Sequence, residues 1–151
     1  MIMIGDNKKK LKEVAHGILG EGRSLRIPAE GYSMYPAIKP GNIILINPVN
    51  DPAILKPGDI IAWTRDSDLV VHRLIRISER KGEKRFVTCG DISITNDKPI
   101  STARIAGKVE YAEDSGQLVK LKSNIPTEWR RKINRNKVKV IRLLKRLGLR
   151  N

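Results

Sequence analysis

The stretch KPGNIILINPVNDPAILKPGDII, residues 39–61, contains one turn motif twice, and an apolar run or strand follows each copy. Proline presets the first backbone angle of a tight turn, and glycine accepts the positive φ of the next position. Pro40-Gly41 and Pro57-Gly58 therefore each predict a type II turn that leads into a β-strand. We interpret the repetition as turn chemistry used twice and not as a functional repeat.

Strand-like runs of the same kind continue on both sides of this stretch. Each is short, rich in valine, isoleucine and leucine, and bounded by glycine, proline or polar residues. Such runs indicate a mainly β fold built from short strands. Seven strands are predicted, at Leu25–Pro28, Asn42–Asn47, Asp59–Thr64, Leu69–Ile77, Arg85–Cys89, Arg104–Tyr111 and Gln117–Leu121.

The two ends of the chain have helical patterns instead. Apolar residues recur at helical spacing between residues 9 and 20, which predicts a short N-terminal helix. A second helix is predicted to begin at Thr127 and to stop at Gly148. It is basic and amphipathic, and one face carries Ile133, Lys137, Val140, Ile141, Leu144 and Leu147.

Length and composition suit one domain with two tails. The chain has 151 residues, of which 40% are hydrophobic, enough for one sizeable core. We divide it into an N-terminal helical segment (1–24), a β-rich domain (25–122) and the basic C-terminal helix (123–151). The sequence sets no oligomeric state.

Positive charge gathers in the C-terminal segment. The net charge is +14, and residues 123–151 hold ten lysine or arginine residues against one acid, Glu128. This helix has three interpretations: packing on the β-domain, contact of residues 127–147 with an anionic membrane surface, or contact with nucleic acid. Aromatic residues make up only 4% of the chain, a poor base-stacking platform, so nucleic acid is the least favoured partner.

Cysteine content and hydropathy favour a cytoplasmic location. Cys89 is the only cysteine, so no intrachain disulfide can form, which suits a reducing compartment. No run approaches the roughly 18 apolar residues of a membrane span, and the first residues lack the apolar region of a signal peptide. Any membrane contact is therefore expected to be peripheral.

Few residues are available for catalytic chemistry. No phosphate-binding loop, paired-cysteine spacing or metalloprotease helix occurs, so neither a metal nor another cofactor is expected. His16 and His72 are the two histidines, and histidine suits general-base duty near neutral pH. Strand alternation places His72 on one face with Val70 and Leu74.

A serine and two aspartates complete the candidate set. Ser33 stands in GYSMYP, residues 31–36, where a glycine before it and a proline after it predict a fixed, exposed turn. The loop CGDISITND, residues 89–97, carries Asp91 and Asp97. A serine, a histidine and a carboxylate thus lie at three separate strand edges, as a nucleophile, its base and an orienting group require.

Four segments in this order resemble the type I signal peptidases. Residues 31–38 are similar to the Ser-Met-x-Pro nucleophile box of that family, residues 57–63 to the following strand box, residues 70–75 to the base box and residues 89–97 to the Gly-Asp loop. The matching region extends over about residues 25–111. The resemblance implies a serine endopeptidase with the β fold that signal peptidases share with self-cleaving repressors.

The resemblance also implies a role for each site residue. Ser33 is the expected nucleophile, and its backbone N–H the expected oxyanion-hole donor. His72 is the expected base, as in the endoplasmic-reticulum, archaeal and sporulation-type branch, and we expect it within hydrogen-bond reach of Ser33. Asp91 is the preferred orienting carboxylate and Asp97 the second candidate. The residues expected to form the substrate cleft are Gly31, Tyr32, Met34 and Pro36, with the bulky Tyr32 narrowing it.

Two functions follow from these observations. The first is an endopeptidase acting on a peptide or protein substrate. The second is a catalytically silent β-module of the same fold that binds a peptide, an anionic membrane surface or nucleic acid. The joint presence of Ser33, His72, Asp91 and Asp97 favours the peptidase, because a silent module does not need all four.

Overall fold

Both Pro-Gly turns of residues 39–61 form as predicted. The computed structural model describes residues 13–15, 17–66 and 68–149, and in it Gly41 has a φ of 88° and Gly58 a φ of 100°. The N–H of Asn42 donates to the carbonyl of Lys39 at 3.1 Å, and the second turn repeats this bond at the same length. The two turns precede the two strands that pair with the same central strand of the sheet from either side.

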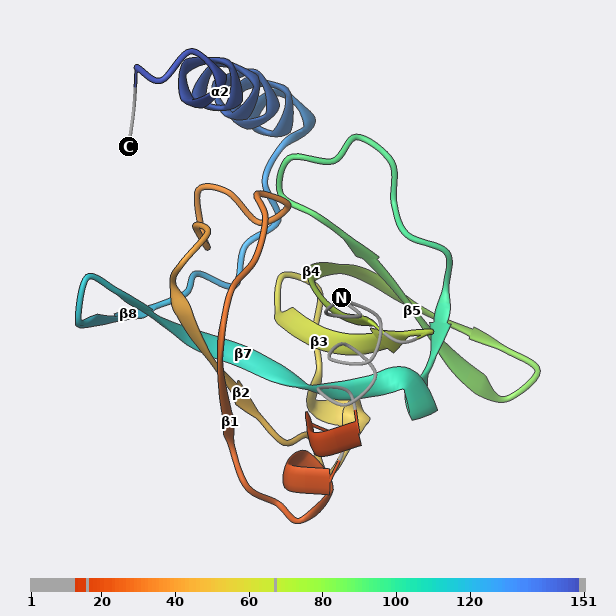
Figure 1. The fold of residues 1–151 in the computed structure, drawn as a ribbon. Coiled ribbons are helices and arrows are strands. Elements are labelled where there is room, and N and C mark those ends of the chain that lie inside the picture. The colour runs from red at the N-terminus through yellow and green to blue at the C-terminus, as the bar shows by residue number, and fades with distance from the viewer. Residues whose placement is uncertain (1–12, 16, 67, 150–151) are drawn as a thin grey trace.

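All the strands in the described residues belong to one antiparallel sheet (Figure 1). The seven predicted strands are present, and an eighth, two-residue strand was not predicted. The sheet order is β1-β2-β7-β3-β4-β5-β6, and β8 pairs with β7. The bounds are β1 Leu25–Pro28, β2 Ile43–Asn47, β3 Ile60–Arg65, β4 Asp68–Arg80, β5 Glu83–Cys89, β6 Ile100–Ser101, β7 Ile105–Asp114 and β8 Gln117–Lys120, with 3-10 turns at Pro52–Ile54 and Thr102–Arg104.

The long strand β7 organises this arrangement. It pairs with β2, β3 and β8, and its register shifts once against β2 and once against β3, with one extra residue on β7 at each shift. Bulges bend and twist a ladder, so β7 can join two groups of strands that diverge from it (Figure 1). The fold therefore has two apolar clusters instead of one flat layer.

One cluster lies with β1, β2, β7 and the N-terminal helix, and the other lies with β3, β4 and β5. Residues 13–15 and 17–20 are helical, and Ala15 and Leu19 are buried in the first cluster. The first part of the predicted N-terminal helix, and His16, lie outside the described residues. Val70 and Leu74 are buried in the second cluster, while Val71 packs against the first, as strand alternation predicts.

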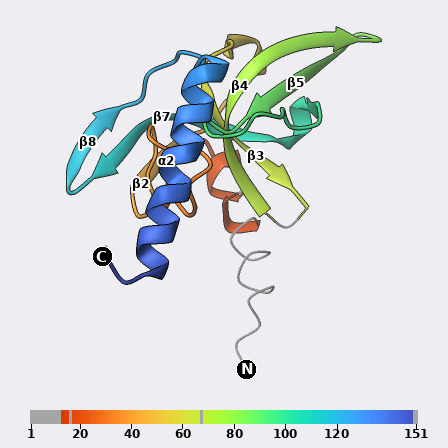
Figure 2. The same cartoon turned by 90° about the horizontal axis from the view of Figure 1, so that it is seen from above.

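The C-terminal helix α2, Glu128–Arg146, begins as predicted at Thr127, whose hydroxyl accepts a hydrogen bond from the N–H of Arg130 at 3.3 Å. It runs along the outside of the molecule, with its C-terminal end away from the β4–β5 hairpin (Figures 1 and 2). Over the part of the chain that the structure describes, no helix combines the length and the apolar character that crossing a membrane requires.

Candidate active site

A cavity of about 560 Å³ is lined by two of the residues that the sequence predicts to be catalytic. Two strand segments provide much of its lining, residues 27–31 at the end of β1 and residues 68–72 at the start of β4. Ser33 and His72 both line it, although they come from elements that are not neighbours in the sheet. The cavity is the space in which a substrate would reach both side chains.

Asp97, and not Asp91, holds the imidazole of His72. Nδ1 of His72 lies 2.6 Å from Oδ2 of Asp97, and both side chains are largely buried. The hydroxyl of Thr88, on β5, donates to the same carboxylate oxygen at 2.7 Å. The loop after β5 turns back so that the N–H of Asp97 donates to the Thr88 carbonyl at 2.8 Å. The carboxylate is thus fixed by its backbone and by two side-chain partners.

These contacts keep Asp97 ionised. Burial by itself raises the pKa of the Asp97 carboxyl group, but the hydrogen bonds from His72 and Thr88 and the positive charge of Arg65 have the opposite effect. The net result is a pKa below the ordinary value for aspartate. An ionised carboxylate at Nδ1 favours the tautomer in which Nδ1 carries the proton and Nε2 has the free lone pair.

Gly90 brings the other ring nitrogen close to the Ser33 segment. A Cβ atom at position 90 would lie 2.8 Å from the carbonyl oxygen of Ser33 and 3.3 Å from Nε2 of His72. The Ser33 carbonyl also accepts a hydrogen bond from the N–H of Ile92 at 3.2 Å. The Gly-Asp loop therefore packs against both the serine backbone and the imidazole, and a side chain at position 90 would crowd both.

The serine hydroxyl itself is not hydrogen-bonded to the histidine. Within the described ranges no hydrogen bond joins Ser33 Oγ to His72, so the expected bond is not formed. Hydrogen bonds in catalytic sites are often long or misaligned before substrate binds. The structure thus brings Ser33 and His72 to one cavity without completing their contact.

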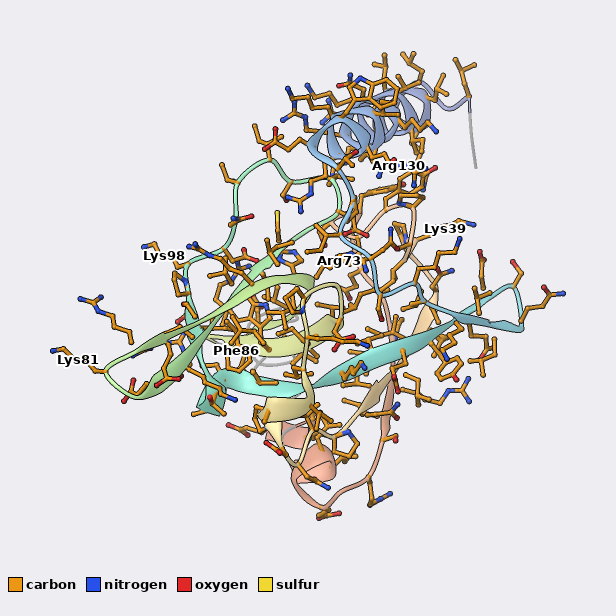
Figure 3. The ribbon with its side chains drawn as sticks, turned by 180° about the vertical axis from the view of Figure 1, so that it is seen from behind. Lys39, Arg73, Lys81, Phe86, Lys98 and Arg130 are labelled. Carbon is orange, nitrogen blue, oxygen red and sulfur yellow. The ribbon has the colours of Figure 1, made fainter. Side chains whose placement is uncertain are left out.

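Asp91 has a different partner, which corrects the preference for it that the family resemblance implied. Its two carboxylate oxygens accept from Nε and Nη2 of Arg73 at 2.8 and 2.7 Å, and both side chains are fully enclosed. Nη1 of Arg73 donates to the carbonyls of Gly58 and Lys122 at 2.9 and 2.7 Å. Arg73 therefore ties the Gly-Asp loop to a Pro-Gly turn and to the segment before α2 (Figure 3).

Of the residues expected to form the cleft, Gly31 and Met34 line the cavity, whereas Tyr32 and Pro36 do not. The ring of Tyr32 lies against α2, with Cζ of Arg142 5.4 Å and Nζ of Lys145 5.9 Å from its centroid. The narrowing of the cleft by Tyr32 is therefore not found. The side chain instead connects the serine segment to the C-terminal helix.

Three supporting residues were not assigned roles from the sequence. Thr88 orients Asp97, Arg73 neutralises Asp91, and Gly90 leaves room between Ser33 and His72. The Gly-Asp motif indicated Gly90 as part of a loop, but its role depends on a contact across the chain. Among the described residues, no group of three or more histidine, cysteine or acidic side chains could hold a metal ion.

Comparison with known proteins supports a relationship to signal peptidase I. The chain is 31% identical over 75 residues to "Signal peptidase I W" of Bacillus subtilis (strain 168). The aligned part covers 48% of this chain and 40% of that protein, so the chain spans less than half of the relative's length. No protein-family model matches the chain. The similarity points to a peptidase-like function.

Proposed function

We propose that this chain is a serine endopeptidase of the signal-peptidase type, which cleaves a peptide or protein substrate. Ser33 is the nucleophile, His72 the general base and Asp97 the carboxylate that orients the imidazole. The observation that carries the proposal is the position of His72, which has Nδ1 on Asp97 and Nε2 beside Gly90 and lines the same cavity as Ser33. A histidine base supports a place in the endoplasmic-reticulum, archaeal and sporulation-type branch of the family.

Proton transfer follows from this orientation of the ring. Nε2 of His72 takes the proton of the Ser33 hydroxyl as Oγ attacks the scissile carbonyl, and Asp97 stabilises the imidazolium. The imidazolium then gives that proton to the leaving amine, and water hydrolyses the acyl-enzyme through the same base. Substrate binding closes the remaining gap between Oγ and Nε2.

The oxyanion is stabilised by the backbone N–H of Ser33. Gly31, two positions before the nucleophile, has no side-chain hydroxyl that could act as a second donor. The stabilisation therefore comes from backbone donors, which are already oriented before the reaction.

The substrate binds as an extended segment beside β1. This strand pairs with β2 and ends the sheet order, so its outer edge can accept another strand. Ile27, Leu69 and Val71 line the cavity next to that edge and favour apolar side chains in the substrate. The single thiol, Cys89, is consistent with a reaction in the cytoplasm.

A peptide-library digest followed by mass spectrometry tests the proposal. We expect cleavage by the wild type and a loss of about 10³-fold or more in Ser33→Ala and in His72→Ala. Ser93→Ala is the matched control, because Ser93 Oγ would lie 3.0 Å from a Cβ at position 90 and so borders the same site. It should retain cleavage.

The same variants separate the peptidase from the silent β-module. The absence of a Ser33–His72 hydrogen bond is the observation that favours the module. A wild type that cleaves no peptide and reacts with no serine-directed covalent probe would support it. Cleavage or labelling that persists in Ser33→Ala but disappears in Ser93→Ala would move the nucleophile to the Gly-Asp loop and refute the assignment of Ser33.

A further inference from the structure

Helix α2 presents much of its apolar face to solvent. Trp129 is 72% exposed and Leu147 is 61% exposed, and Val140 and Leu143 are exposed as well. At 3.6 residues per turn these four side chains lie along one face, because 11 residues complete about three turns from 129 to 140. The buried residues of the helix, Arg131 and Val138, lie on the opposite face.

This exposure is unusual, because an amphipathic helix normally packs its apolar face against the rest of the domain. Arg131 donates from Nη1 to the sulfur of Cys89 at 3.3 Å, and Arg142 and Lys145 lie over Tyr32. The helix is therefore attached to the β-domain through these cationic side chains together with the buried Val138. Its apolar stripe, defined here as Trp129, Val140, Leu143 and Leu147, remains available to another partner.

Basic residues border the stripe on both sides. The helix holds nine lysine or arginine residues and one acid, Glu128. Lys132, Lys139 and Arg146 recur every seven residues along one border, Arg130 and Lys137 do so along the other, and all five are exposed. Among the described residues, none of them forms an ion pair, so their charge is not neutralised within the chain.

These features match one kind of partner. A basic helix with an exposed apolar stripe and a tryptophan lies in the interface of an anionic bilayer, where apolar side chains insert and lysine and arginine contact headgroups. Nucleic acid would use the charge but leave the apolar stripe in water. A second copy would cover the stripe only by bringing two strongly positive helices together.

We propose that α2 docks in the plane of an anionic lipid bilayer, with the apolar stripe inserted and the bordering basic residues on the headgroups. The assignment does not depend on catalysis at Ser33. It does place a bilayer next to the candidate site, because Tyr32, which α2 contacts, is the residue before Ser33.

The two tryptophans make the proposal measurable without a label. Trp63 is 3% exposed in the core, so a change of environment on binding would come from Trp129. Adding phosphatidylcholine vesicles that contain phosphatidylglycerol should shift the emission to the blue and sediment the protein. Pure phosphatidylcholine vesicles should bind about tenfold or more weakly, and added salt should weaken binding to the anionic vesicles.

Variants identify the surface that binds. Leu143→Ser combined with Leu147→Ser should lower vesicle affinity about tenfold or more. Leu118→Ser is the matched control, because Leu118 is 65% exposed on β8, away from α2. It should bind as the wild type does. Ser33→Ala should also bind normally, so failure here is distinguishable from failure of the peptidase proposal.

Three results would overturn the proposal. Equal vesicle binding by the double leucine variant and the wild type would remove the apolar stripe from the interaction. A Trp129 shift with duplex DNA and none with anionic vesicles would assign α2 to nucleic acid. Concentration-dependent dimerisation that the double variant abolishes would make a second copy the occupant. Circular dichroism of each variant confirms that the fold is intact.

Discussion

His72 Nδ1 and Asp97 Oδ2 lie 2.6 Å apart, although one residue belongs to the long strand β4 and the other to a loop after β5. The ring of His72 is oriented by the carboxylate of Asp97, which the Thr88 hydroxyl and the backbone of the loop hold in place.

Replacing Asp97 should impair catalysis far more than folding. In Asp97→Asn the shape of the side chain is kept, but the amide no longer favours the tautomer with a proton on Nδ1. We expect kcat to fall by about 10³–10⁴-fold. The urea unfolding midpoint should change only slightly from that of the wild type. A variant with unchanged kcat would show that another group orients His72.

The lowered pKa of Asp97 predicts a specific pH dependence of stability. Because the pKa of Asp97 in the folded chain lies below the ordinary value of 3.8, the ionised form stabilises the fold above that pH, and this contribution is lost as the pH falls through the lowered pKa. The difference in unfolding free energy between wild type and Asp97→Asn should shrink as the pH falls below about 4. Urea titrations at each pH measure it, and a constant difference down to pH 3 would contradict the shift.

Replacing Asp91 should impair folding more than catalysis. Asp91→Asn leaves the guanidinium of Arg73 enclosed without its counter-charge, and breaking a buried ion pair costs about 3–5 kcal/mol. Asp114→Asn is the matched control, since its ion pair with Lys39 lies at the surface, and it should move the midpoint much less. Equal midpoints for the two variants would show that the Arg73–Asp91 pair does not hold the loop.

A methyl group at Gly90 should disturb the site directly. In Gly90→Ala the added carbon meets the Ser33 carbonyl at 2.8 Å, so the serine segment or the loop has to move. Displacements of this kind lower kcat by about 100-fold. Gly17→Ala, where the added carbon has no neighbour within 4 Å, should leave kcat unchanged. Wild-type activity in Gly90→Ala would mean that the tight spacing is dispensable.

Cys89 should react slowly with thiol reagents while the chain is folded. Burial raises the pKa of its thiol, although the positive charge of Arg131 acts in the opposite direction. Modification by a disulfide reagent should accelerate strongly in denaturing urea. Rapid reaction of the native wild type would contradict this packing.

The strands could be predicted from local sequence because turn chemistry and apolar runs are local properties. Both Pro-Gly turns and all seven predicted strands are present. The two-residue strand β6 could not be predicted, because Ile100 and Ser101 form a strand only through pairing with Phe86 and Arg85. The extension of β4 to Arg80 likewise depends on its pairing with β5.

The candidate site was less predictable because it depends on the path of one loop. Asp91 and Asp97 both follow Gly90, and spacing alone does not say which of them turns back to His72. The bond from the Asp97 N–H to Thr88 decides it, together with the capture of Asp91 by Arg73. The exposure of the apolar stripe of α2 could not be predicted either, since periodicity identifies an apolar face but not whether that face points to solvent or to the β-domain.

Helix α2 contacts both Tyr32, next to the candidate nucleophile, and Cys89, next to Gly90. One rigid element thus spans the two segments that bracket the reaction centre. If a bilayer alters the affinity of the cleft for a peptide, thermodynamic linkage requires that the peptide alter the affinity for the bilayer by the same factor. Occupied and empty molecules would then partition differently between solution and surface, and the substrate itself would regulate where the chain resides.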